Sequence, residues 1–412
     1  AMVRRLQEYY GIEWFPEDGA SYPVRVFLMK DIVNIAVVGL GPIGSLHVKN
    51  LLSQKIAGAR LACICEQRGA DSAQYGGVPI FTDLDEMLKS RSFDAAVIST
   101  PSFTHYPLAK KILQAGYDVL VEKPVALCTS DAEDLRETAR KLGKVCAVML
   151  NQRTNALYSK IRDLVVSGQL GEINRVSWTM TSWYRPNIYF TSSPWRGTWK
   201  GEAGGALVNQ SIHNLDIFAW TFGVPEKLRA WCEFGKYHDI EVEDEVVCRM
   251  KLKNGANATF TTSTGEFPGE NRLVIAADRG FIETDGDTLK FTRYKNGSLS
   301  EYTRDTRYMF GSPECECTEE VVSDKGAQHA GVMQNFADAL AGRDMLRFDV
   351  SEAMGSLGLA NGMLMSAWCG CEVDFPLDGA KYKRLLDEKI AQSRLRENPR
   401  SDAVVEFSKS FK

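Results

Sequence analysis

The sequence lacks the features that would assign it to several specialised classes of protein. No apolar run approaches the roughly 18 to 20 residues that a membrane-spanning helix needs. Lysine and arginine are scattered and the formal net charge is −4, so neither a nucleic acid nor a membrane surface is expected as a partner. What remains is the composition of an ordinary globular protein, with 44% apolar and 25% charged residues.

Cysteine is also too sparse to define the fold. Ten cysteines in 412 residues do not make a disulfide scaffold. No C-x-x-C pair is present, and the C-x-C pairs that begin at Cys63, Cys315 and Cys369 give little support to a metal site, so none is expected. The first residues have no signal-peptide pattern. We therefore expect a cytoplasmic protein.

The length predicts more than one domain, because single cores rarely grow beyond about 250 to 300 residues. Residues 1–30 mix aromatic, charged and turn residues without a period, and we interpret them as an N-terminal extension that docks on the body, with a leader segment as the alternative. Residues 31–150 and 151–395 are interpreted as two domains. Residues 396–412 are interpreted as a C-terminal tail.

The first domain alternates between apolar strands and helices. Runs such as VNIAVV and DAAVIST are almost continuously apolar, and the helix-like stretches between them end at glycine. Buried strands that alternate with helices are typical of a parallel sheet covered on both faces. The sequence therefore predicts an α/β, doubly wound domain.

The second domain has a different rhythm. INRVSWTMTSW alternates like a half-buried strand, and Asn-Gly between two strand-like runs in VEDEVVCRMKLKNGANATFTTSTGE predicts a hairpin. Helices are expected near residues 205–222 and again at 326–341, 350–369 and 380–393. These patterns predict an α+β domain with a mostly antiparallel sheet.

A G-x-G-x-x-G segment lies between the first predicted strand and its helix, which is the context that a dinucleotide site requires. Gly39 permits the tight turn, Gly41 lets the backbone approach a pyrophosphate, and Gly44 allows close packing of helix on sheet. With Pro42 and Ile43, these residues are expected to contact the cofactor. The alternative is a glycine-rich turn in a protein that binds no nucleotide.

The acidic residue that ends the next predicted strand bears on the choice of cofactor. Glu66 would accept hydrogen bonds from the ribose hydroxyls and repel a 2′-phosphate. This favours NAD over NADP. Arg68 weakens the preference, because its side chain could turn toward such a phosphate.

Two further segments follow predicted strands, STPSFTHYP (99–107) and EKP (122–124). Because the carboxyl ends of parallel strands meet at one edge, both segments should face the same crevice as the glycine loop. A solvated lysine at a strand end is the alternative reading of EKP. The residues expected to contact the cofactor here are Thr100, Pro101, His105, Glu122 and Lys123.

A polar stripe lies on the otherwise apolar segment EAGGALVNQSIHNLDIFAW (202–220). On one helix, Asn209, His213 and Asp216 would share a face. We predict that Asn209 and His213 take part in catalysis and in substrate binding. The alternative is a core histidine that is hydrogen-bonded to Asp216.

These segments resemble the glucose–fructose oxidoreductase, inositol dehydrogenase and rhizopine-catabolism (Gfo/Idh/MocA) family over roughly residues 33–392. The resemblance rests on the glycine loop, TPSFTH, EKP and GGALVNQSIHNLD, with later agreement at VEDEV, STGEFPGENR and NFADAL. It implies an N-terminal Rossmann domain and a C-terminal domain with a large open sheet that often forms a homodimer or homotetramer interface. It also implies NAD(P)-dependent oxidation or reduction of a sugar or polyol carbon.

The resemblance implies roles for individual residues. Lys123 matches the lysine that touches the reacting hydroxyl, and His213 matches the proposed acid/base. Asn209 stands where inositol dehydrogenases carry an aspartate, and it adds no charge to the histidine, so Lys123 is expected to take a larger share. The chemistry agrees, because hydride leaves a carbinol carbon readily only when a base also removes the hydroxyl proton.

Residues 177–202 are rich in aromatic side chains, which stack on the apolar faces of sugar rings, although core or interface packing is an equal alternative. Arg185 and Arg196 could bind hydroxyls or a carboxylate. The substrate is expected to be a carbohydrate or cyclitol. Besides Lys123, Asn209 and His213, the residues expected to contact it are Arg153, Trp183, Arg185 and Trp195.

Three functions fit these observations. The favoured one is an NAD(P)-dependent dehydrogenase acting on a sugar, glycoside or cyclitol. The second is an NAD-dependent glycoside hydrolase or lyase, which oxidises a ring carbon transiently, eliminates the glycosidic substituent and returns the hydride. The third is a non-catalytic nucleotide-binding protein.

Overall fold

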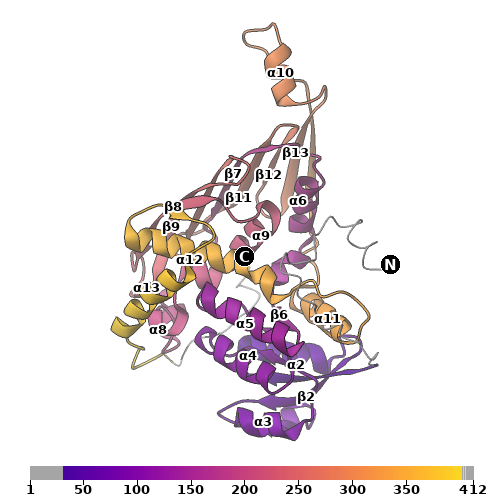
Figure 1. Cartoon of the computed structure of the whole chain (residues 1–412), viewed down its shortest axis with the longest axis vertical. Helices are drawn as coiled ribbons and strands as arrows, with labels where there is room; N and C mark the ends of the chain where they lie inside the picture. Colours follow the sequence, from indigo (N-terminus) through magenta and orange to yellow (C-terminus); the bar gives the residue numbers. More distant parts are fainter. Residues whose placement is uncertain (1–30, 401, 403, 405–412) are drawn as a thin grey trace.

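Two β-sheets, each built from one half of the chain, organise the protein (Figure 1). The structure is a computed structural model that describes residues 31–400, 402 and 404. The predicted N-terminal extension and most of the predicted tail therefore lie outside the described residues. Within the described part, no helix combines the length and the apolar character that crossing a membrane requires.

The first sheet has six parallel strands in the order β3-β2-β1-β4-β5-β6. Every residue of β4, β5 and β6 is buried, because helices cover both faces. This confirms the predicted doubly wound α/β fold. The strands are β1 (Val33–Val38), β2 (Ala59–Cys65), β3 (Ile80–Phe81), β4 (Ala95–Ile98), β5 (Asp118–Val121) and β6 (Cys146–Val148).

The strand order reverses between β1 and β4. The chain steps from β1 to β2 in one direction and from β4 to β5 in the other, so right-handed crossovers place their helices on opposite faces. A crevice opens where the carboxyl ends of β1 and β4 diverge, which is where such sheets bind ligands. The helical elements of this half are α2 (Pro42–Leu52), η1 (Ser72–Tyr75), α3 (Leu84–Ser90), η2 (Ser102–Thr104), α4 (His105–Gln114) and α5 (Thr129–Leu142).

The second sheet has nine strands in the order β14-β13-β12-β11-β7-β10-β9-β8-β15, and only β7 and β10 pair in parallel. Asn254 and Gly255 lie in the tight connection between β9 and β10, so the predicted hairpin is confirmed. The strands are β7 (Ile173–Met180), β8 (Lys227–Phe234), β9 (Glu243–Lys251), β10 (Asn257–Ser263), β11 (Asn271–Ala277), β12 (Gly280–Thr284), β13 (Thr288–Tyr294), β14 (Cys315–Val321) and β15 (Val373–Asp374).

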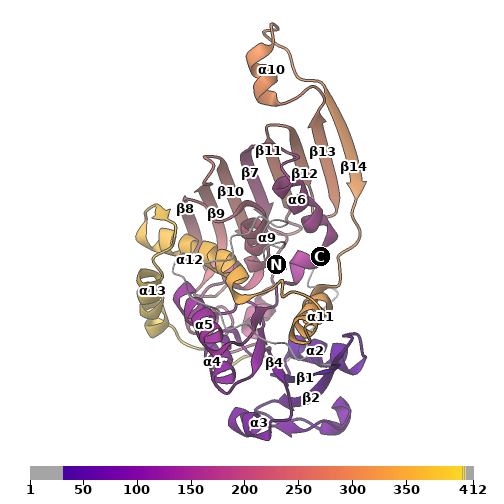
Figure 2. The same ribbon diagram turned by 45° about the vertical axis from the view of Figure 1, so that its right-hand side comes forward.

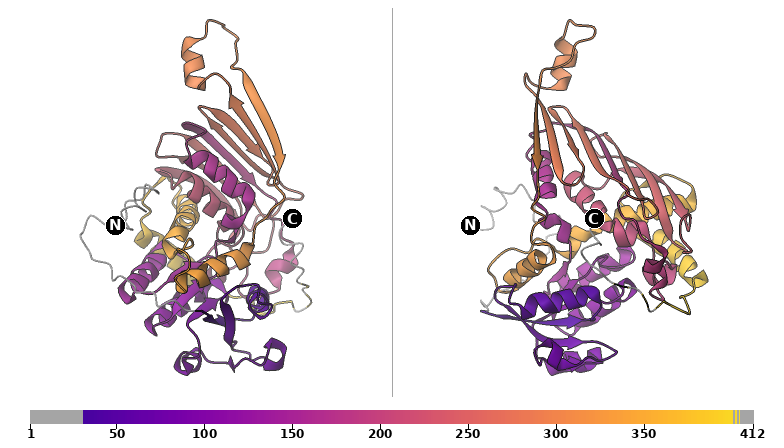
Figure 3. Two further views of the ribbon diagram at one scale, coloured as in Figure 1. Left: turned by 90° about the vertical axis from the view of Figure 1, so that its right-hand side faces the viewer. Right: turned by 180° about the vertical axis from the view of Figure 1, so that it is seen from behind.

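Helices pack against one face of this sheet (Figure 2). Seen from behind, no described helix covers the other face, where Trp231 and Val247 are 56% and 45% exposed (right panel of Figure 3). The helical elements of this half are η3 (Asn151–Thr154), α6 (Ala156–Val166), α7 (Asn187–Thr191), α8 (Trp199–Glu202), the π-helical turn η4 (Ala206–Gln210), α9 (Ile212–Phe222), α10 (Leu299–Asp305), α11 (Gln328–Leu340), η5 (Val350–Ala353), α12 (Met354–Cys369) and α13 (Gly379–Gln392).

Residues late in the sequence return to the first sheet. Met333 and Phe336 of α11 are fully buried in the core of the parallel sheet. The amide of Val148 donates to the carbonyl of Phe348 at 2.8 Å, which extends the sheet edge beyond β6. The two halves of the protein are thus joined by packing as well as by the chain.

A buried ion pair connects three separate segments. The guanidinium of Arg153 (η3) donates to both carboxylate oxygens of Asp216 (α9) at 2.8 Å, and it also donates to Glu352 (η5) at 2.6 Å. The side chains of Arg153 and Asp216 are each 4% exposed. The expected helical stripe is therefore wrong at two points: Asp216 turns toward Arg153, and Asn209 lies in η4, outside α9.

Replacement of Asp216 by alanine should lower the free energy of unfolding by about 3 to 5 kcal/mol, because it removes the buried carboxylate that pairs with Arg153 and leaves the half-exposed Glu352 as the only described ion-pair partner of the guanidinium. Glu352→Ala is the matched control. The carboxylate of Glu352 is 46% exposed, so its loss should cost about 1 kcal/mol or less. Urea denaturation of both variants measures the difference, and equal losses would contradict this assignment.

Candidate active site

The glycine loop is shaped for close contact with a ligand. Gly39 has a φ of 94°, in the left-handed region that favours glycine. A Cβ on Gly44 would lie 1.9 Å from the carbonyl oxygen of Gly39, so only glycine lets the helix approach the strand this closely. A Cβ on Gly41 would meet nothing within 4 Å. Open space therefore lies above Gly41, where a pyrophosphate would approach.

The N-terminus of α2 faces that space. Gly41 is its N-cap and Pro42 follows it, and no side chain caps the first amides. Uncapped amides at a helix N-terminus form an anion site, so this loop fits the phosphates of a dinucleotide.

Glu66 lies one residue beyond β2 and is tied to the loop. Its carboxylate accepts hydrogen bonds from the amide of Leu40 at 2.8 Å and from Nε of Arg68 at 3.1 Å. Burial raises the pKa of Glu66, but these hydrogen bonds outweigh burial and leave the pKa below its usual value. The carboxylate is therefore ionised at neutral pH, and the side chain of Arg68 is 82% exposed.

The loop that follows β4 is anchored by His105. Its ring nitrogens lie 2.7 Å from the carbonyl oxygens of Thr100 and Pro124, so the ring bridges the loops after β4 and β5. The methyl of Thr100 lies against Gly39, where a Cβ would be 2.9 Å away. His105 is 2% exposed and positions the loop that contains Thr100 and Pro101.

Glu122 and Lys123 follow β5. The carboxylate of Glu122 is buried and lies 2.8 Å from Nε2 of His47 on α2. Burial raises the pKa of Glu122, but the hydrogen bond and the charge of His47 lower it to about 2. The ring of His329 from α11 lies edge-on to His47, with 5.8 Å between ring centres. The strand end that carries Lys123 is thereby fixed to α2.

Lys123 extends from this strand end toward the other half of the protein. Its Nζ donates to the carbonyl oxygen of Asn209 at 2.9 Å. Burial lowers its pKa to about 8, with Glu122 opposing and the charges of Arg196 and Arg185 adding to the decrease. A larger fraction of an amine with this pKa is unprotonated near neutral pH than of a surface lysine, so more of it is available to act as a base.

The side chain of Asn209 points away from His213. Its amide nitrogen donates to the carboxylate of Glu202 and to the hydroxyl of Tyr189, the latter at 3.2 Å. Glu202 is 2% exposed, also accepts from the amide of Gly197 at 2.7 Å, and lies 3.8 Å from Arg196. Burial raises the pKa of Glu202. The carboxyl group that Asn209 lacks is thus present in its neighbour.

A second buried carboxylate holds the turn that contains Asn209. One oxygen of Glu243 accepts from the amides of Gly205 and Leu207, at 2.8 and 2.9 Å. The other oxygen has no hydrogen-bond partner among the described residues. Burial raises the pKa of Glu243 to about 7. A Cβ on Gly205 would lie 2.2 Å from the carbonyl oxygen of Glu243, so the turn packs directly on β9.

His213 begins the first turn of α9 and is partly buried. Burial, together with the charge of Lys123, keeps its pKa well below its usual value, so the ring is neutral. The indole of Trp183 lies 6.5 Å from it, measured between ring centres, and is held by a 3.0 Å hydrogen bond to Asn214. Within the described residues, no protein group hydrogen-bonds the ring of His213, which leaves both nitrogens available to a ligand.

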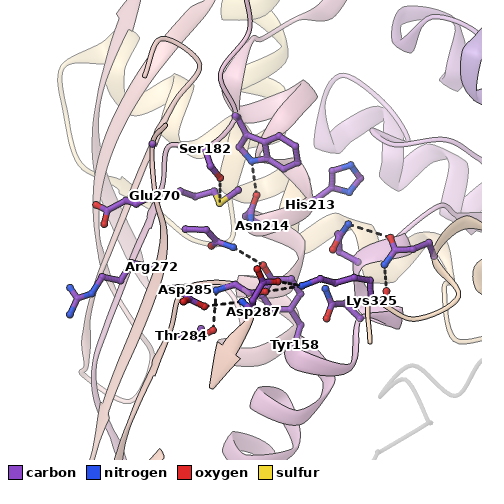
Figure 4. A pocket seen from close by; sticks show the side chains of 18 of the residues that line it. Tyr158, Ser182, His213, Asn214, Glu270, Arg272, Thr284, Asp285, Asp287 and Lys325 are labelled. Atoms are coloured by element: carbon purple, nitrogen blue, oxygen red, sulfur yellow. Dashed lines mark hydrogen bonds and ion pairs between the residues drawn. The ribbon is translucent and has the colours of Figure 1, made fainter. Parts of the chain in front are cut away.

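A cavity of about 1450 Å³ lies between α2, α11 and the large sheet. His213 lines it across from Glu270 and Arg272 of the sheet (Figure 4). Pro42 and Ile43 line it as well, whereas Lys123 and Asn209 do not. Of the three catalytic candidates, His213 is therefore the one that lines the cavity. Further lining residues are Tyr158, Met180, Trp183, Asn271, Asp285 and Lys325.

Arginine and aromatic side chains form the wall beside Lys123. The guanidinium of Arg196 lies 4.1 Å from the ring centre of Tyr189 and 4.6 Å from that of Trp195. The guanidinium of Arg185 lies 5.3 Å from the ring centre of Tyr189 and 5.5 Å from that of Trp183. The wall therefore combines aromatic rings with positively charged guanidiniums.

Of the predicted site residues, Pro42, Ile43, Trp183 and His213 line one cavity. Lys123 contacts Asn209 outside that lining, and Arg153 stays apart in its ion pair with Asp216. Sequence reasoning missed the buried carboxylates of Glu202 and Glu243 and the pairing of His47 with Glu122. The signal for Glu243 was present, because VEDEV is one of the segments that carried the family resemblance, whereas Glu202 lies just before such a segment. Among the described residues, no group of acidic, histidine and cysteine side chains could hold a metal ion.

Comparison with known proteins identifies two matching family models. The model described as "Oxidoreductase family, NAD-binding Rossmann fold" matches residues 33–150. The model described as "GFO/IDH/MocA C-terminal domain" matches residues 158–283. Together the two ranges span more than half of the chain.

Individual curated relatives share less than a third of their aligned residues with this chain. A scyllo-inositol 2-dehydrogenase (NAD(+)) of Bacillus subtilis is 28% identical over 200 residues, which is 47% of this chain and 55% of the relative. A D-glucoside 3-dehydrogenase of Escherichia coli is 28% identical over 255 residues, which is 56% of this chain and 70% of the relative. The chain thus spans about half the length of the first of these relatives.

Solved structures share the fold over a larger part of the chain. WlbA dehydrogenases from Chromobacterium violaceum and Bordetella pertussis, both in complex with NADH and UDP-GlcNAcA, superpose with TM-scores of 0.73 and 0.71. Each is 24% identical and covers 84% of this chain, with 97% and 100% of the respective neighbour covered.

Glu243→Gln should alter the pH dependence of stability. The pKa of Glu243 rises from 4.5 to about 7 on folding, so the stability that the protonated form contributes is complete below 4.5 and is lost as pH rises through 7. The variant should therefore gain on the wild type between pH 5 and 8, by up to about 3 kcal/mol. Thermal unfolding across this range measures the gain.

Glu245→Gln is the matched control on the same strand. Hydrogen bonds from Lys236 and Tyr237 lower the pKa of Glu245, so its loss should destabilise the protein at neutral pH. A Glu243→Gln variant that loses stability toward pH 8 in the same way would contradict the assignment.

Proposed function

We propose, from the premise that this chain belongs to the Gfo/Idh/MocA oxidoreductase family, that it transfers a hydride between a nicotinamide cofactor and a carbinol carbon of a sugar, glycoside or cyclitol. The observation that carries the proposal is the environment of Lys123. Lys123 follows β5 at the carboxyl edge of the parallel sheet, and its amine, with a pKa of about 8, donates to the carbonyl of Asn209 from the other half of the protein. A buried amine of that kind has little structural use, because burying it costs free energy.

The residues that would hold the cofactor are those of the crevice. The α2 N-terminus at Gly41 and Pro42 would bind the pyrophosphate, and Glu66 would accept from the ribose hydroxyls. When bound, the nicotinamide supplies the acceptor or donor of the hydride. The loops after β4 and β5 would form the walls on either side of it.

Lys123 would take the proton of the reacting hydroxyl, and Asn209 would hold the amine in place through its carbonyl. His213 is neutral and has both nitrogens free of described protein partners, so it would hydrogen-bond the same hydroxyl or the one beside it. Glu202 accepts a hydrogen bond from the side chain of Asn209 and would hold Asn209 in position.

The substrate class follows from the wall and from the relatives. Trp183 lines the cavity and could stack on a sugar, and the cavity beyond His213 has room for the substituents of the sugar. The relatives named above act on an inositol and on D-glucosides. Carbohydrates and cyclitols are therefore the substrates to test first.

We also propose that the uncovered face of the large sheet pairs with a second copy of the chain. Trp231 and Val247 on that face are large apolar side chains in contact with solvent, and faces of this kind usually become interfaces. A homodimer or homotetramer would bury them. All ten cysteines are free thiols, in line with the cytoplasmic location that we propose.

Lys123→Met should lower kcat for sugar oxidation by about 10² to 10⁴, the usual contribution of a general base, and should lower the affinity for NADH by a smaller factor. Because the base must be unprotonated, kcat/KM of the wild type should rise with pH and level off above about 8. Lys111→Met is the control, since Lys111 lies on the outer surface of α4 in a pair with Asp85.

The assay would follow NADH and nitrophenol together, with nitrophenyl glycosides, free sugars and inositols. Unchanged turnover in Lys123→Met would contradict the assignment of the base. Nitrophenol released without net NADH would show the hydrolase or lyase reaction with transient oxidation instead.

Glu66→Ala should weaken NAD binding by roughly 10- to 100-fold, the effect of losing charge-assisted hydrogen bonds, and should reduce the discrimination against NADP. Dissociation constants for NADH and NADPH, from quenching of tryptophan fluorescence, measure both effects. Glu86→Ala, which removes an exposed carboxylate of α3, is the control. An unchanged ratio of the two constants would exclude Glu66 as the selective residue.

A further inference from the structure

Arg185 and Arg196 converge on the ring of Tyr189, beside the proposed base. Their guanidinium carbons lie 5.3 and 4.1 Å from its ring centre. The hydroxyl of Tyr189 accepts from Asn209 at 3.2 Å, and the carbonyl of Asn209 accepts from Lys123. Arg185 also lies over Trp183, which is next to His213. The two guanidiniums therefore lie close enough to Lys123 for their charges to lower its pKa.

The charges at this place do not balance. Arg196 lies 3.8 Å from Glu202, which compensates it. Arg185 forms no ion pair with any carboxylate among the described residues, and its guanidinium donates to the carbonyl of Tyr184 at 2.9 Å. Burial lowers the pKa of Arg185, a hydrogen bond to Tyr189 opposes this, and the charge of Arg196 lowers the pKa further. Within the described residues, the positive charge of Arg185 therefore has no carboxylate that compensates it.

The fold holds Arg185 firmly in this unfavourable position. Its amide donates to the carbonyl of Thr264 at 2.9 Å, and its carbonyl lies 2.8 Å from Nε2 of His238. The other nitrogen of His238 lies 3.2 Å from the buried carboxylate of Asp244. Both backbone groups of Arg185 are thus fixed. A partly buried guanidinium that has a fixed backbone, and no ion pair with a described carboxylate, is typical of a residue that binds an anionic ligand.

We infer that the substrate ring carries a carboxylate, as in a uronate or another sugar acid, and that Arg185 binds this carboxylate while Lys123 and His213 face the reacting hydroxyl. The inference rests on the proposed dehydrogenase function and narrows its substrate class. A carboxylate is the planar, two-oxygen acceptor that matches the guanidinium fork.

The charge count favours a carboxylate over a phosphate. Glu202 already compensates Arg196, and Lys123 must be neutral to act as a base, so only the charge of Arg185 remains for the substrate. A monoanion balances it. A phosphate monoester carries about −1.5 to −2 at neutral pH and would leave excess negative charge next to Glu202.

The test compares matched substrates in NAD⁺ reduction by the full chain. Methyl uronides of the gluco, galacto and manno series form one arm, the corresponding neutral methyl hexosides the second, and hexose 6-phosphates the third. We expect kcat/KM for one uronide to exceed that of its neutral counterpart by about 10- to 100-fold, the range for charge-assisted hydrogen bonds. Calorimetric binding of the same uronide in the presence of NADH should show the same preference.

Arg185→Gln should abolish the preference of uronide over hexoside in both measurements. The variant should also need a higher pH to reach its full kcat/KM, because the pKa of Lys123 rises when a neighbouring positive charge is removed. At a given pH below this point, its kcat/KM should be lower than that of the wild type. Arg185→Lys keeps the charge without the fork and should retain part of the preference. Arg293→Gln is the matched control, since it removes a guanidinium that stacks on Phe291 far from the site.

The outcomes separate the two proposals. Equal turnover of uronides and hexosides would overturn the carboxylate inference and leave the dehydrogenase standing. Preference for the 6-phosphates would overturn it in favour of a phosphate ligand. Failure of all three arms to reduce NAD⁺, with NADH still bound, would instead count against the dehydrogenase itself, and uronide binding by calorimetry would then decide the role of Arg185 alone. If Arg185→Gln still prefers the uronide over the hexoside, Arg185 is not the residue that binds the carboxylate.

Discussion

The hydrogen bond from Nζ of Lys123 to the carbonyl of Asn209 connects the two halves of the site, and the other features depend on it. One end belongs to the strand edge of the parallel sheet, and the other to the π-helical turn in front of the large sheet. Such a bond has a defined geometry only if both ends are rigid. Each end is held by a buried carboxylate, Glu122 on one side and Glu243 on the other.

The two carboxylates differ in how their ionisation affects the stability of the fold. Glu122 is paired with His47, and its pKa falls to about 2, so its ionisation favours the fold. Glu243 has only backbone amides as partners, and its pKa rises to about 7, so its ionisation opposes the fold. Glu243 therefore lowers the stability of the protein at neutral pH while it fixes the position of a turn. The turn is the one that presents Asn209 to Lys123.

The sequence predicted the parts of the molecule that local patterns specify. The glycine loop, the strand ends and the β9–β10 hairpin each depend on neighbours within a few residues, so they were readable. The helical stripe was not, because a π-helical turn at Asn209 breaks the 3.6-residue period that the stripe assumes. Arg153 was assigned to the substrate because nothing in the sequence indicates that Asp216 and Glu352 meet it in the fold.

The same long-range contacts explain how the base is tuned. Burial is the main cause of the low pKa of Lys123, and the charge of the adjacent Glu122 is the largest effect that opposes it. Arg196 and Arg185, more than 60 residues away in the sequence, lower the pKa further through their positive charges. An anion bound to Arg185 would offset one of these charges and raise the proton affinity of the amine. Lysine would therefore be a weaker base before the substrate binds and a stronger one afterwards, when the hydroxyl proton must be removed.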